Sequence, residues 1–158
     1  MTGSCDPDRP KNNPHRPDRY DAVSYTPYPQ SIPRARRRVA RLAAEWGHPG
    51  AAGDAALLAS ELCTNALLHG CLRDRLFRVE TSLIGQVLRI AVTDPKGERL
   101  PEPRTAQDSD QFGRGLLIVR VLASRWAVEN LTVGKTVWAE LNGADEGGDC
   151  AESPSGTP

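Results

Sequence analysis

Residues 77–94 alternate apolar with polar side chains on both sides of a central Gly85-Gln86 pair. A two-residue period is typical of strands that bury one face, and a glycine-led pair between two such runs favours a tight turn. The segment therefore predicts a β-hairpin. Because a hairpin with one apolar face needs a covering layer, other segments of the chain are expected to supply helices on that side.

Three other segments have the apolar spacing of helices. Ser31 and Pro33 open the first of them, which ends at Gly47. Asp54 is the expected N-cap of the second, and Gly70 is its expected C-terminal stop. The expected helices cover residues 31–46, 54–69 and 113–126.

Further strands complete the pattern. Residues 126–130 and 136–141 predict two closing strands around Gly134-Lys135, and residues 20–25 are a candidate edge strand. The order of helices and strands predicts an α+β fold. We expect a two-layer sandwich, in which three helices cover one face of a largely antiparallel, mixed sheet.

Length and composition limit the classes of protein that this chain can be. Its 158 residues suit one domain, expected at residues 20–142, between polar tails at 1–19 and 143–158 that are expected to be disordered. The formal net charge is zero, which gives no bulk attraction to nucleic acid or an anionic membrane. No apolar run approaches the ~20 residues that span a bilayer, and the N-terminus lacks an apolar signal region. A cytoplasmic location without membrane contact is expected.

Glu61 and Asn65 interrupt the second helix, which is otherwise rich in alanine and leucine. At positions i and i+4 they share one face, about one turn apart. One interpretation is a solvated stripe that also includes His69. The other is a reactive site, because a carboxylate can accept a proton and an amide oxygen is a hard ligand for Mg²⁺. Taken alone, this helix leaves both interpretations open.

Three further features follow in chain order. Asp94 ends the second hairpin strand, either as a turn former or as a site residue. Residues 95–112 are polar and aperiodic, which is typical of a lid, a binding loop or disorder. Gly113-Arg114-Gly115 then begins the third helix, where glycines either form a hinge or let backbone N–H groups approach an anion.

Taken in order, the segments ELCTNALLHG, AVTD with a following glycine, GRGLLIV and GKTVWAEL resemble the GHKL ATPases. This superfamily includes gyrase-type topoisomerases, heat-shock chaperones, histidine kinases and anti-sigma-factor serine kinases. The resemblance is greatest to the small stand-alone anti-sigma kinases of actinobacterial type, and it covers residues 30–142. It implies the Bergerat ATP-binding fold, with ATP and Mg²⁺ as cofactors.

The resemblance also implies a role for each matching residue. Glu61 would be the general base and Asn65 the Mg²⁺ ligand. Asp94 would accept a hydrogen bond from the adenine amino group, supported by the Thr136 hydroxyl. Arg114 is a candidate catalytic residue, because its charge would lie near the γ-phosphate. The remaining positions expected to bind the nucleotide are Gly97, Gly113, Gly115 and Leu116.

Gly97 departs from the family pattern, because the usual Asp-x-Gly becomes Asp94-Pro95-Lys96-Gly97. Two functions are therefore predicted. The first is an anti-sigma-type serine/threonine protein kinase that regulates transcription by partner switching: it binds a sigma factor in one state and phosphorylates an antagonist protein in the other. The alternative is a non-catalytic, ATP-gated module that sequesters a regulatory partner. This branch often forms dimers, so a homodimer is an open alternative.

The first helix carries a local cluster of arginines: Arg34, Arg36, Arg37, Arg38 and Arg41. A solvated face, contact with an acidic protein and contact with nucleic acid are the three interpretations. Net neutrality and the absence of interleaved aromatic residues disfavour the last one. No direct nucleic-acid partner is therefore expected.

Overall fold

A computed structural model describes residues 16–69, 75–94, 115–132 and 134–143. The elements in these ranges are β1 (Arg19–Tyr25), α1 (Ser31–Glu45), the 3-10 turn η1 (Pro49–Ala51), α2 (Ala52–His69), β2 (Phe77–Ile84), β3 (Val87–Asp94), α4 (Gly115–Leu122), β4 (Arg125–Asn130) and β5 (Lys135–Asn142). The predicted hairpin is β2 with β3, and the candidate edge strand is β1. The expected lid, 95–112, and most of both tails lie outside the described residues.

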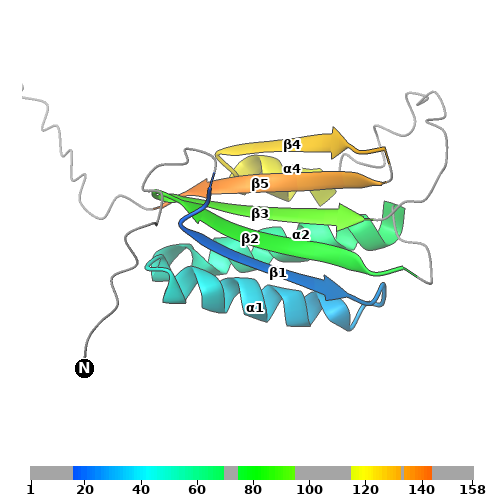
Figure 1. Cartoon of the computed structure of the whole chain (residues 1–158), viewed down its shortest axis with the longest axis horizontal. Coiled ribbons are helices and arrows are strands. Elements are labelled where there is room, and N and C mark those ends of the chain that lie inside the picture. Colours follow the sequence, from blue (N-terminus) through cyan, green and yellow to red (C-terminus); the bar gives the residue numbers. More distant parts are fainter. Residues whose placement is uncertain (1–15, 70–74, 95–114, 133, 144–158) are drawn as a thin grey trace, which may run out of the picture.

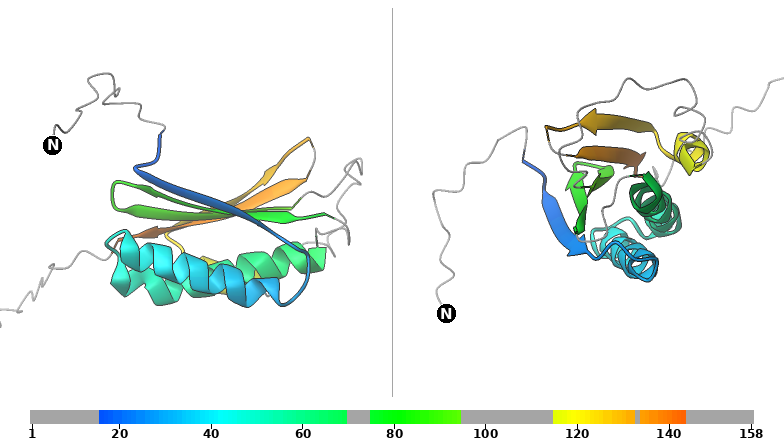
Figure 2. Two further views of the ribbon diagram at one scale, coloured as in Figure 1. Left: turned by 60° about the horizontal axis from the view of Figure 1, so that its bottom comes forward. Right: turned by 90° about the vertical axis from the view of Figure 1, so that its right-hand side faces the viewer.

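The strands form one sheet in the order β1-β2-β3-β5-β4, with every pairing antiparallel. Helices α1, α2 and α4 lie on the same face of this sheet (Figures 1 and 2). The predicted α+β sandwich is confirmed, with a sheet that is antiparallel throughout its described strands rather than mixed. No helix of the described residues lies on the second face of the sheet (Figure 2).

The core fills the space between the sheet and its helices. Alternate residues of the hairpin face inward, and Phe77 and Ile90 are fully buried there. They belong to one cluster with the inward faces of α1 and α2, which include Val39, Leu58 and Leu62. Each buried aliphatic or aromatic side chain contributes about 1.5–3 kcal/mol, so this layer drives folding. Among the described helices, none is long and apolar enough to cross a membrane.

Two predicted helix ends differ from the structure. α2 begins at Ala52, directly after η1, so Asp54 lies in the first turn rather than at the cap. Its carboxylate still lies where the helix dipole favours negative charge. α4 ends at Leu122 and not at Trp126, because the chain joins the sheet there: the Ser124 N–H donates to the Glu140 carbonyl at 2.9 Å.

One end of the sheet is closed by the hairpin turn. Gly85 has φ 59°, a left-handed conformation that glycine adopts without a steric penalty. β1 begins at this end, because Arg19 pairs with Leu83. β5 finishes at the same end, because Asn142 pairs with Val87. The predicted site residue of β3 therefore lies at the opposite end of the sheet (Figure 1).

Polar side chains close the helix-free face of the sheet. Trp138 is only 7% exposed on that face. Arg89 lies over its ring at 4.0 Å, and its indole N–H donates to Glu129 at 3.0 Å. Arg89 also lies 3.8 Å from Glu129 and 3.6 Å from Glu140. A cation–π contact and ion pairs thus shield the tryptophan where no helix does.

Candidate functional site

Helix α2 carries the predicted Glu61–Asn65 pair and packs against α1, β3, β5 and α4. Glu61 is half-buried, whereas Asn65 is only 6% exposed. The Asn65 Nδ2 atom has no hydrogen-bond partner among the described residues. Leaving a buried polar group unpaired costs about 1–3 kcal/mol, and a ligand would remove that cost. This environment contradicts the interpretation of Asn65 as part of a solvated stripe.

Asp94 ends β3 close to the C-terminal half of α2 (Figure 1). Its side chain is 1% exposed. Leu62 and Ala66, which follow the two candidates on α2, share one buried cluster with Val92, which precedes Asp94 on the same face of β3. The C-terminal half of α2, which carries Asn65, and the end of β3 thus lie toward the same end of the molecule (Figure 1).

Thr136 and Lys135 lie on opposite faces of β5. The Thr136 hydroxyl is 2.8 Å from the Thr93 hydroxyl, on the helix-free face of the sheet. Asp94 is buried on the helix-covered face, so the Asp94 and Thr136 side chains leave the sheet on opposite faces, and the role of Thr136 stays a prediction. Lys135 is instead the register partner of Asp94 and is 5% exposed.

Lys135 is a buried residue beside the candidate site that sequence reasoning did not single out. It has the same strand parity as Val137 and Ala139, which are buried against the helices. The alternation along β5 could have predicted that Lys135 faces the helices, because every second side chain of a strand lies on the same face. Directly opposed residues have Cβ atoms about 4.5–5.5 Å apart. The end of the sheet thus combines a buried ammonium and a buried carboxyl group at paired positions.

The glycine-rich segment is only partly described. Gly115 is the first residue of α4, and Leu116 is buried in the core. α4 packs against α2, the helix of the candidate pair. Gly97, Gly113 and Arg114 lie outside the described residues. Their roles stay predictions.

The donor groups of this site fit a metal that arrives with a nucleotide. Within the described ranges, no group of three or more His, Cys, Asp and Glu side chains could hold a metal ion. Mg²⁺ commonly takes one or two protein ligands and completes its shell with waters and substrate phosphates. The Oδ1 atom of the buried Asn65 side chain is the group that could serve as such a single protein ligand, whereas the unpartnered Nδ2 atom is a donor for a hydrogen-bond acceptor.

Comparison with protein families identifies the fold. The model of the histidine kinase-like ATPase domain matches residues 25–141. The chain belongs to this family. The matched range runs from the end of β1 almost to the end of β5, so it includes Glu61, Asn65 and Asp94. For a histidine kinase-like ATPase domain, ATP binding is the implied property.

A solved structure has the same fold. It is the crystal structure of the RsbU and RsbW domains of Rv1364c from Mycobacterium tuberculosis, with a TM-score of 0.60 and 20% identity. The similarity covers 78% of this ATPase domain chain and 32% of that chain, so the chain spans about a third of that protein. A comparison with curated protein sequences gives no match.

Proposed function

We propose that this histidine kinase-like ATPase domain is an ATP-dependent serine/threonine protein kinase of the anti-sigma type. The observation that carries the proposal is the burial of the Asn65 side chain one helical turn from the half-buried Glu61. A hard oxygen ligand and a carboxylate on one helix face are the groups that phosphoryl transfer needs. The motif order supports the anti-sigma branch, and the fold is shared with a structure that includes a domain named RsbW.

The proposed chemistry assigns one task to each side chain. ATP supplies the γ-phosphoryl group. Asn65 would hold Mg²⁺, which would neutralise phosphate charge, and Asp94 accepts the hydrogen bond of the adenine amino group. Glu61 accepts the proton of a serine or threonine hydroxyl on the protein partner. The oxygen of that hydroxyl forms the new P–O bond as the bond to ADP breaks, so the proton ends on Glu61 and ADP leaves.

The non-catalytic, ATP-gated module remains a second candidate on one specific observation. Lys135 is buried at the position paired with Asp94. An ammonium group at this position competes with an adenine amino group for the carboxylate, which weakens the nucleotide site. Such a domain would bind its partner differently with and without ATP, and it would transfer no phosphate.

Replacing the proposed base separates the two functions. Partners are first captured on the immobilised full chain with and without ATP–Mg²⁺, and transfer from radiolabelled ATP to the captured proteins is then measured. We expect Glu61→Gln to retain ATP affinity in calorimetry while transfer falls by about 10²–10⁴-fold, the usual contribution of a general base. Glu45→Gln, on the exposed side of α1, is the matched control and should transfer normally.

Each other result has a clear meaning. Full transfer by Glu61→Gln would show that another group is the base. A wild-type chain that binds ATP and captures a partner without phosphorylating it is the non-catalytic module. No ATP binding at millimolar concentration would overturn both functions.

A further inference from the structure

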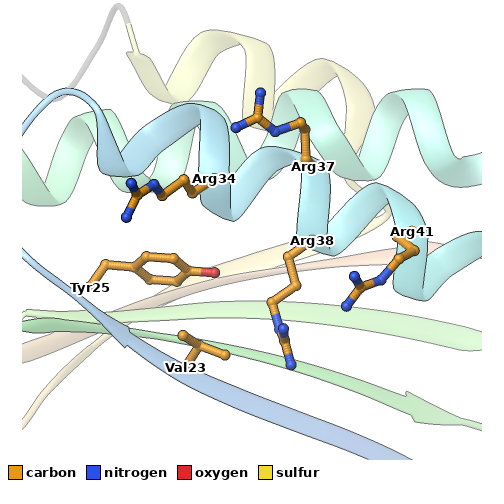
Figure 3. Close-up of a pocket in the computed structure, with 6 residues that line it drawn as sticks. All are labelled: Val23, Tyr25, Arg34, Arg37, Arg38 and Arg41. Atoms are coloured by element: carbon orange, nitrogen blue, oxygen red, sulfur yellow. The ribbon is translucent and has the colours of Figure 1, made fainter.

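Strand β1 and helix α1 flank an open hollow of about 490 Å³ (Figure 3). Two residues of β1 and four of α1 line it: Val23, Tyr25, Arg34, Arg37, Arg38 and Arg41. We call it the arginine hollow. β1 is an edge strand and lies two strands away from β3, at about 4.8 Å per strand. None of the six lining residues belongs to the candidate nucleotide site.

Arginines outnumber carboxylates around the hollow. Arg38 donates to both oxygens of Asp21, at 2.6 and 2.8 Å, and Arg41 lies 3.5 Å from the carboxylate one turn further along α1. Within the described ranges, neither Arg34 nor Arg37 forms an ion pair. Four arginines against two carboxylates leave an excess of two positive charges. A solvated face explains isolated charges, but it does not explain their gathering around one concavity.

Tyr25 gives the hollow an apolar wall and a polar tip. Its ring stacks on Phe77 with the ring centres 5.8 Å apart, so the ring is held in place from the core side. Its hydroxyl points in among the arginine side chains (Figure 3). Burial raises the pKa of Tyr25, so the hydroxyl is protonated at neutral pH and can donate a hydrogen bond. Charge and hydrogen bonding thus both favour an anionic ligand.

The spacing along α1 sets the size of that ligand. Arg34 and Arg41 are separated by 41 − 34 = 7 positions, or about 10.5 Å at ~1.5 Å per residue. An extended peptide advances ~3.3 Å per residue and presents alternate side chains on one side. Three or four of its residues span the hollow and bring two carboxylates to the arginines. We propose that the arginine hollow binds an acidic, extended segment of a protein partner.

Charge argues against other occupants. A second copy of the chain related by a two-fold axis would place this arginine surface against itself, and like charges would repel. Nucleic acid presents phosphates over a much longer surface than this hollow, and the chain has no net positive charge to attract it. The inference rests on the proposed function for the existence of a partner, and it adds where on the fold that partner docks.

The test uses a synthetic probe and the full chain without nucleotide. The probe is a fluorescein-labelled decapeptide of alternating glutamate and serine, and its neutral counterpart has glutamine in place of glutamate. Fluorescence anisotropy measures both affinities for the wild type. It also measures them for the double variant Arg34→Gln/Arg37→Gln and for the control double variant Arg16→Gln/Arg75→Gln. The control removes the same charge from exposed arginines outside the hollow.

We expect the hollow variant to bind the acidic peptide about tenfold more weakly and the control variant to bind it within about twofold of wild type. Equal losses in the two double variants, or equal binding of the neutral peptide, would overturn the inference. So would tighter binding of a short DNA duplex than of the acidic peptide. ATP affinity is measured separately by calorimetry. If ATP binds and the peptide does not, this inference fails while the proposed function stands.

Discussion

At the scale of single residues, helix α2 buries two polar atoms that have no partner among the described residues. They are the Asn65 Nδ2 and the Ser60 Oγ. Both cost stability for the same physical reason, because each exchanged water for an environment without a described hydrogen bond. Only Asn65 lies on the face of Glu61 and matches the expected metal ligand. Comparing variants of Asn65 and Ser60 therefore separates the stability cost of burying a polar atom from a role in ATP binding.

We expect Asn65→Leu to raise the free energy of unfolding by about 1 kcal/mol, because a buried amide is replaced by an apolar side chain of similar size. ATP–Mg²⁺ binding should be lost in the same variant. Ser60→Ala is the control, and it should be as stable as wild type or more stable while ATP affinity is unchanged. Urea titration and calorimetry measure the two quantities. An Asn65→Leu chain that binds ATP with wild-type affinity would remove Asn65 from the site.

At the scale of elements, α1 is tied to the edge strand β1 by the bidentate pair of Arg38 and Asp21. The hydrogen bonds from Arg38 lower the pKa of Asp21, and the charge of Arg41 acts in the same direction. A carboxyl group with a lowered pKa stabilises the fold above its unfolded-state pKa, which is about 3.9. That stabilisation is lost as the pH falls through the lower folded-state pKa.

Asp21→Asn should therefore cost about 1 kcal/mol of unfolding free energy at pH 7, a modest value because Arg38 is partly exposed. Below pH ~4 the difference from wild type should shrink towards zero, since the carboxylate becomes protonated in both states. Urea unfolding at a series of pH values measures the difference. A cost that stays constant from neutral to acid pH would show that shape, and not charge, holds the strand.

Helices and strands could be predicted from the sequence, because the periodicity of apolar residues is a local property. The contacts between these elements could not be predicted from it. Alternation around Gly85 predicted β2 and β3, and the apolar spacing between Asp54 and Gly70 predicted the helix of Glu61 and Asn65. The register of β3 and β5 arises only when the two strands meet, and it places Lys135 opposite Asp94. The burial of Asn65 likewise depends on packing between elements, which the spacing along one helix cannot reveal.

At the scale of the whole molecule, the strand order gives central and outer strands different numbers of hydrogen-bonded neighbours. β3 and β5 have hydrogen-bonded neighbours on both sides, whereas β1 and β4 are each paired on one side in the described sheet. Ile90 and Ala139, which face each other across β3 and β5, are both fully buried. Opening the molecule at these residues requires breaking the core itself.

We expect the amide of Ile90 and its neighbours in β3 and β5 to exchange with solvent deuterium last, at rates set by global unfolding. Backbone amides of β4 and β1 should exchange faster by roughly two orders of magnitude, because local opening exposes an edge strand. Hydrogen exchange followed by NMR resolves the individual amides. If β4 were as protected as β5, an interaction beyond the described strands would have to cover that edge.

The direction of the strands also bears on how the domain can be combined with others. β1 starts and β5 finishes beside the Gly85 turn, and the candidate nucleotide site lies at the other end of β3. A domain whose first and last strands meet at one end can be joined to a neighbouring protein, or inserted into one, through that end. Such a fusion would leave the candidate nucleotide site, at the opposite end of the sheet, uncovered. A similar domain within the much longer Rv1364c chain is an example of such modular use.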